Sequence, residues 1–341
     1  MNRIPAVLAL SALVWPVTAS AHIKWFVEFD TTKAPEPIMQ VLTTPGFWWL
    51  LLLSVAAIYV SSVFDRRIPS LTDLAEWQPK LERWHSFVPQ IMRYGTGTFF
   101  LILSASFPYI LLTPELVTDN PWLRYVHVFI AVLAFHRRTS FMAGLGIIFL
   151  YSYSIQLYGT FHMLDYIIFV GTGVYLIVQT VRPAGIQGLD LELLRFVLCY
   201  SFLWGGLEKF TQPDLFYKLL EGHAYLAMGL DWEFFVRACG FVEICLAWHI
   251  YTGKLAAYLA IAVLALLVVI AFIPFGVTDM IGHFLFIVPL IAVLLTPRKE
   301  VVFKTAVANT FGFLVALLGF LLLSYVSYFI LHYHLHPHLN L

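Results

Sequence analysis

Apolar runs long enough to cross a membrane constrain this chain more than any other feature. They recur between residues 46 and 331, and each is roughly 18 to 25 residues long, where about 20 helical residues span a hydrocarbon core about 30 Å thick. The chain is 60% hydrophobic and 12% charged, whereas soluble domains average about 45–50% and about 25%. The sequence therefore predicts an all-α polytopic membrane protein.

Ten transmembrane helices are expected, at about 46–64, 89–113, 121–136, 140–158, 162–181, 191–209, 232–250, 255–274, 279–296 and 306–331. Alternate connections carry most of the basic residues: Arg66, Arg67, Lys80, Arg83, Arg137, Arg138, Arg182, Lys254, Arg298, Lys299 and Lys304. Because cytoplasmic loops are enriched in Lys and Arg, we expect a bacterial-type inner-membrane protein whose N- and C-termini are periplasmic. The lipid bilayer is therefore an expected partner.

The first 21 residues resemble a secretory signal peptide. Arg3 precedes an apolar stretch, and Ala19-Ser20-Ala21 forms an A-x-A cleavage site. Cleavage there would make His22 the mature N-terminus and leave residues 22–45 as a short periplasmic segment. The alternative is an uncleaved helix, although the apolar stretch is short for a span.

Two stretches of four helices, 89–182 and 190–297, show a weak internal likeness. The fourth helix of each stretch opens with a glycine, Gly159 or Gly276, followed by a His/Asp pair at helical spacing. We expect either two tandem four-helix units in parallel orientation or a chance similarity. The helices at 46–64 and 306–331 would flank these units.

Ionisable residues at membrane depth are costly, so each needs a partner, a wet cavity or a function. The second unit holds the most: Arg195, Glu208, Lys209, Arg237, Glu243, Asp279 and His283. Glu243 lies near the middle of its helix, and Arg237 is on another face, so a partner for Glu243 is expected from another helix. Arg195 and Lys209 could instead extend to the interfaces, and Asp279 could be a helix N-terminal acid. In the first unit, His162 and Asp165 are a similar pair of ionisable residues.

A family resemblance lies in the same region. Leu194-Arg195-Phe196 through Gly205-Gly206-Leu207-Glu208-Lys209-Phe210, followed by Pro213, resembles the first helix of DoxX-like membrane proteins. Gly240-Phe241-Val242-Glu243 and Gly282-His283-Phe284 are similar to motifs of that family's second and fourth helices. The resemblance covers about residues 190–297, and it implies a redox accessory protein or a quinone-linked subunit of a membrane oxidoreductase system.

The candidate catalytic residues are Glu243, His283, Glu208 and Asp279, and the candidate cofactor-binding residues are Arg195 and Lys209. Glu243, Glu208 and His283 are expected to form a polar pocket toward the outer half of the membrane. Glu208 or His283 would pass protons to the outer water, because a histidine can titrate near neutral pH.

A histidine-rich tail suggests a rival function. His332, His334, His336 and His338 alternate, which would place them on one side of an extended chain. Together with His22 they are candidate ligands for copper or zinc, so the protein could handle or transport a transition metal. Two other interpretations are open: the tail is a polar terminus that binds no metal, or the protein is a structural partner of a larger membrane complex.

The formal net charge is +0, so the chain provides no basic field for nucleic acid.

Overall fold

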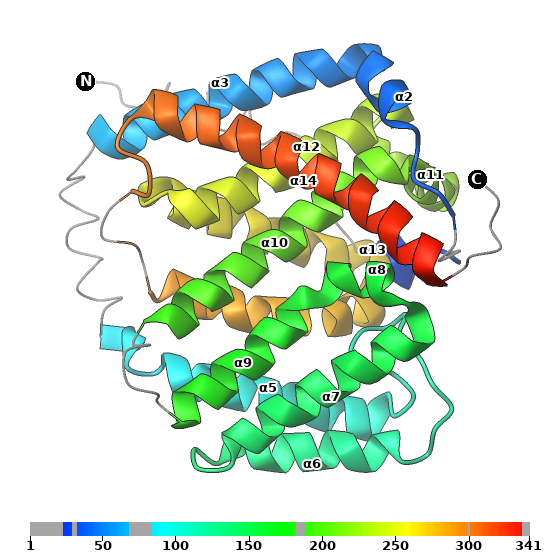
Figure 1. Cartoon of the computed structure of the whole chain (residues 1–341), viewed down its shortest axis with the longest axis vertical. Coiled ribbons are helices and arrows are strands. Elements are labelled where there is room, and N and C mark those ends of the chain that lie inside the picture. Colours follow the sequence, from blue (N-terminus) through cyan, green and yellow to red (C-terminus); the bar gives the residue numbers. More distant parts are fainter. Residues whose placement is uncertain are drawn as a thin grey trace.

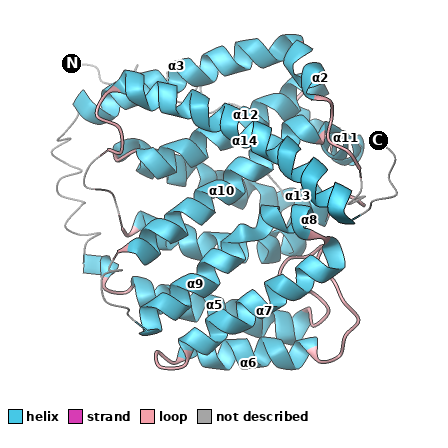
Figure 2. Cartoon of the chain, in the orientation of Figure 1, coloured by secondary structure: helices cyan, strands magenta, loops and turns pink. Residues whose placement is uncertain are grey.

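The computed structural model describes residues 23–28, 33–67, 83–181, 188–296, 298 and 301–335, and all regular structure in these ranges is helical (Figure 2). The helices are η1 (Ile23–Trp25), α2 (Ile38–Thr43), α3 (Pro45–Arg67), α5 (Val88–Ser106), α6 (Leu123–Phe135), α7 (Ser140–Tyr158), α8 (Thr160–Met163), η2 (Leu164–Tyr166), α9 (Ile167–Val181), α10 (Leu189–Thr211), α11 (Pro213–Gly222), η3 (Ala224–Ala227), α12 (Trp232–Thr252), α13 (Leu255–Leu294) and α14 (Ala306–Leu335). The all-α fold is confirmed.

Six helical stretches in the described part of the chain are long and apolar enough to cross a membrane. They are Gly46–Arg67, Ser140–Tyr158, Thr160–Val181, Trp232–Thr252, Leu255–Leu294 and Ala306–Leu331, and Leu123–Phe135 is a shorter apolar helix. The expected count of ten is not confirmed. Many large apolar side chains are nevertheless exposed on the outside, such as Trp49 and Ile273, as a lipid-facing surface requires. The chain is a membrane protein.

Helix α13 is a hairpin of two helical arms. Gly276 interrupts it with φ 62° and ψ −142°, a conformation that favours glycine. Both ends of α13 lie at the same end of the molecule, because Arg195 binds the carbonyl oxygens of Ile250, which lies near the first arm, and Thr296, which follows the second. The expected spans 255–274 and 279–296 are thus joined without a loop.

Helix α5 ends earlier than the expected span 89–113. It stops at Ser106 because Phe107 precedes Pro108, and a residue before proline is disfavoured in helical geometry. Residues 107–118 then fold back on themselves, with an isolated bridge between Ile110 and Val117. This loop carries Glu115 into the protein interior.

The helices pack in layers, and the first long helix of the chain lies beside the last (Figure 1). α3 and α14 pack together on one side, and α3 also contacts α12. α10, α12 and α13 form the middle, while α5, α6, α7 and α9 form the other side. We call α5 to α9 the first half of the molecule and α10 to α13 the second half. The two halves meet where α9 packs on α10 and where α5 packs on α13. One continuous apolar core runs through all of these helices.

Basic loops gather at one end of the helices. Asp65 at the end of α3 accepts hydrogen bonds from the backbone of Lys254, Leu255 and Ala256. Arg66 donates to the carbonyl of Phe303, and Arg298 pairs with Glu192 near the start of α10. α2, α8 and α11 lie at the opposite end (Figure 1, right).

Candidate functional site

A buried lysine holds together the two halves of the molecule. The ammonium of Lys24 in η1 lies 2.9 Å from Oδ2 of Asp165 in η2 and also contacts Oε1 of Glu208 in α10. All three side chains are almost fully buried. Burial alone would lower the pKa of Lys24, but the negative charges of Asp165 and Glu208 outweigh it and raise the pKa above its ordinary value of 10.5. Lys24 therefore remains charged at neutral pH.

The apolar neighbours of Lys24 fix it in place. Ile23 packs in a small core with α11, α12 and the turn of α13. The ring of Trp25 lies edge-on to the imidazole of His283, with 4.9 Å between centroids. Gly282 leaves room for this ring, because a Cβ at that position would lie 2.1 Å from a Trp25 ring atom. η1 is thus seated tightly between both halves.

A histidine and a carboxylate extend this group. Nε2 of His162 in α8 lies 2.7 Å from Oε1 of Glu115, and both side chains are buried. His162 follows Gly159, whose φ of 84° turns the chain from α7 into α8. Negative charge on Glu115 also acts on Lys24. We define Lys24, Glu115, His162, Asp165 and Glu208 as the Lys24 cluster.

Glu243 is ion-paired, and its partner comes from another helix, as expected. Nζ of Lys209 in α10 lies 2.6 Å from Oε2 of Glu243 in α12. Lys209 also donates to the carbonyl of Gly205 and lies 4.8 Å from the centroid of the Phe216 ring. α10 and α12 approach closely here, because a Cβ on Gly206 would lie 3.0 Å from the carbonyl oxygen of Gly240.

The second His/Asp pair is formed within α13. Nδ1 of His283 lies 3.1 Å from Oδ2 of Asp279, one helical turn earlier, and 3.1 Å from the carbonyl oxygen of that residue. Both residues are buried just after the Gly276 turn. His283 and Glu208 therefore both lie against η1, His283 through Trp25 and Glu208 through Lys24.

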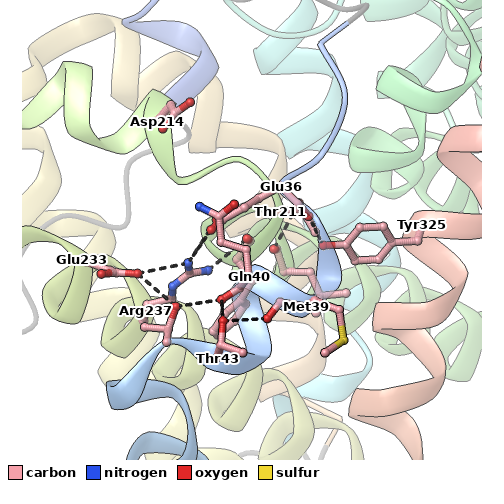
Figure 3. Close-up of polar contacts among 12 residues, drawn as sticks. Glu36, Met39, Gln40, Thr43, Thr211, Asp214, Glu233, Arg237 and Tyr325 are labelled. Atoms are coloured by element: carbon pink, nitrogen blue, oxygen red, sulfur yellow. Dashed lines mark hydrogen bonds and ion pairs between the residues drawn. The ribbon is translucent and has the colours of Figure 1, made fainter. Parts of the chain in front are cut away.

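Arg237 belongs to a separate polar group that fastens the segment after residue 33 (Figure 3). Its guanidinium lies 3.0 Å from Glu36 and 3.4 Å from Glu233, and it donates to the carbonyl of Phe210. The hydroxyl of Tyr325 donates to the carbonyl of Glu36. This group joins α10, α12 and α14 to the N-terminal segment.

Arg195 does not lie with the other candidates. It is buried at the opposite end of α10, where its guanidinium donates to the carbonyl oxygens of Thr296 at 2.5 Å and Ile250 at 3.4 Å. Arg195 thus satisfies the last carbonyls of two helices, a structural task. Arg195 and Lys209, the two candidate cofactor-binding residues, therefore lie near opposite ends of α10.

Metal binding has no support in the described ranges, where no group of three His, Cys, Asp or Glu side chains could hold an ion. The backbone of residues 332–335 continues α14, so the extended-chain alternation does not apply to His332 and His334. His22, His336, His338 and the predicted signal peptide lie outside the described residues.

The most consequential site residues missed from the sequence are Lys24 and Glu115. Lys24 is one of several charges in a short polar segment, and Glu115 lies in the connection between the expected spans 89–113 and 121–136. The only sequence signal was indirect: His162 and Asp165 at membrane depth each needed a partner of opposite charge.

Two pockets lie beside α10. One has a volume of about 200 Å³ and apolar walls from α10, α12 and α14, among them Tyr200, Trp248 and Phe320. The other has about 10 Å³, room for about one water, and is lined by Glu208, Trp204 and Gln212. Tyr200 lines the larger pocket and Trp204 the smaller one, and their rings stack with 5.8 Å between centroids.

Fold and site together define a helical membrane protein with a buried acid–base cluster at one end of its helices. No protein-family model, no curated protein and no solved structure matches this chain.

Proposed function

We propose that this chain is a redox accessory subunit of a membrane oxidoreductase system, and that the Lys24 cluster exchanges protons for that system. The observation that carries the proposal is the composition of the cluster: three carboxylates, one ammonium and one imidazole buried together. The DoxX-like motifs support the redox part. They include Glu208 of the cluster and the adjacent Lys209.

Proton exchange follows from the charges in the cluster. Neighbouring carboxylates disfavour each other's ionised forms, and burial increases that effect. Nε2 of His162 lies 2.7 Å from Oε1 of Glu115, within hydrogen-bond reach, so a proton can pass between the two side chains.

A quinone ring does not fit the pockets described above. Its two carbonyl oxygens need hydrogen-bond donors, but the larger pocket is apolar and the pocket at Glu208 holds about one water. We therefore assign quinone chemistry to a partner subunit. This chain would supply only the proton-exchanging group.

The proposed orientation places the Lys24 cluster toward the periplasm. Arg66, Lys254 and Arg298 lie at the other end of the helices, and basic residues favour the cytoplasmic side. With this orientation the cluster would exchange protons with the outer water through the small pocket beside Glu208.

Infrared titration of the purified protein tests the proposal. The wild type should show a protonation change of carboxyl groups within about pH 5 to 7, and Glu115→Gln should remove or shift it. Asp214→Asn is the matched control, because Asp214 is exposed and outside the cluster. If the wild type and Glu115→Gln show the same spectrum across this range, the cluster is a structural tie and the proposal fails.

A further inference from the structure

The larger pocket lies on the surface that faces lipid and runs along the helices. On α10 it extends from Phe196 to Leu203, about 10 Å by the helical rise. Its walls are mainly aromatic rings and small side chains, and its volume of about 200 Å³ is several times the share of about 30 Å³ that one molecule has in liquid water. Walls of this kind favour an apolar occupant over water.

One end of the pocket, at Phe196 and Tyr251, lies at the basic end of the helices, and we call it the mouth. Tyr251 lines the pocket, and the guanidinium of Arg298 lies 5.5 Å from the centroid of the Tyr251 ring. Phe303, next to the exposed Lys304, stacks on Trp248 of the pocket wall. Cationic side chains therefore lie next to one end of the apolar pocket.

Positive charge exceeds negative charge around this mouth. The described basic side chains at this end include Arg66, Arg67, Arg195, Lys254, Arg298 and Lys304, against the acids Asp65, Asp190 and Glu192. Asp65 is occupied by three backbone N–H groups. Arg298 donates a hydrogen bond from Nε to the carbonyl oxygen of Tyr251 and another from Nη2 to the carboxylate of Glu192. No described residue binds its Nη1, which can therefore donate to a phosphate.

We propose that this pocket binds an anionic glycerophospholipid, with one acyl chain between α10, α12 and α14 and the phosphate at Arg298 and Lys304. A long apolar channel with a cationic mouth at one membrane interface matches the two ends of such a lipid. The binding site goes beyond the proposed function, since it does not involve the Lys24 cluster. Only the choice of the cytoplasmic leaflet depends on the orientation proposed above.

Native mass spectrometry of the full-length protein in detergent provides the test. The probes are phosphatidylglycerol and phosphatidylcholine with identical acyl chains, added to delipidated protein. The wild type should bind phosphatidylglycerol about fivefold or more tightly than phosphatidylcholine, and Arg298→Gln and Lys304→Gln should each lower that preference about fivefold. Lys218→Gln, on α11 at the other end, should leave it unchanged.

Ala316→Phe should fill the pocket and lower the binding of both lipids about tenfold, because the ring occupies the space of the acyl chain. Ala308→Phe, exposed on the same helix, is its control. The proposal is overturned if Ala316→Phe binds lipid as the wild type does, if both lipids bind equally, or if the species retained through purification is an isoprenoid quinone. None of these outcomes affects the infrared titration, so the two proposals fail independently.

Discussion

The ammonium nitrogen of Lys24 lies 2.9 Å from Oδ2 of Asp165, although 141 positions separate the two residues in the chain. Lys24 and Trp25 are adjacent, yet Lys24 reaches the first half of the molecule and Trp25 reaches His283 in the second. Each contact lies just after a glycine with positive φ, Gly159 or Gly276. The short η1 therefore connects the segment after Gly159 with the segment after Gly276.

Removing the Lys24 ammonium should destabilise the protein strongly. Lys24→Met leaves the carboxylates of Asp165 and Glu208 buried without this cation, which costs about 3–5 kcal/mol. Thermal unfolding in detergent measures the loss. Lys33→Met is the control, because its pair with Asp214 is exposed and such pairs contribute about 0–1 kcal/mol. Equal melting temperatures for the two variants would show that Lys24 is not a structural tie.

The stabilising effect of Lys24 should be constant from pH 7 to about pH 10. Its folded-state pKa is raised above the ordinary 10.5, so its contribution is complete below that value and declines only as the pH rises above it toward the folded-state pKa. The difference in melting temperature between wild type and Lys24→Met, measured across this range, checks the prediction. A difference that shrinks between pH 7 and 9 would contradict it.

Gly282→Ala should displace Trp25. The added Cβ would lie 2.1 Å from the indole ring, and such overpacking costs about 1–3 kcal/mol. We expect a lower melting temperature and faster proteolysis of the N-terminal segment. Trp25→Ala should itself destabilise the protein but make Gly282→Ala nearly neutral in its background. Gly319→Ala, where an added Cβ meets nothing within 4 Å, serves as control. Additive effects of the two substitutions would rule out the clash.

Glu243 and Lys209 should show strong energetic coupling. Glu243→Ala leaves the buried ammonium of Lys209 without its carboxylate, at about 3–5 kcal/mol, whereas the apolar pair Lys209→Met with Glu243→Leu should recover much of that loss. A double-mutant cycle by thermal unfolding measures the coupling. Coupling below about 0.5 kcal/mol would mean that the two groups act independently.

Membrane orientation can be tested by reporter fusions. Fusions after Arg138 and Thr296 should report the cytoplasm, and a fusion at Leu341 should report the periplasm, because Lys and Arg concentrate in alternate loops. A cytoplasmic signal at Leu341 would contradict the proposed orientation. It would also move the lipid site to the other leaflet.

Much of the architecture could be predicted from local patterns. Apolar length gave the all-α membrane class, and the Gly276 position marked the break between two helical arms. The predicted end of α5 was wrong because the apolar stretch continues past Pro108. Hydropathy alone does not account for the restricted backbone of the residue before a proline.

The sequence by itself determined which residues would need partners. Glu243 at membrane depth required a cation from another helix, since desolvating a charge is costly whatever the fold, and Lys209 provides it. Only the tertiary structure decided that Asp165 and Glu208 share Lys24, and that His162 meets Glu115. Those pairings join a terminal segment, a loop and two halves of the chain. They depend on packing between distant elements, which neither periodicity nor spacing encodes.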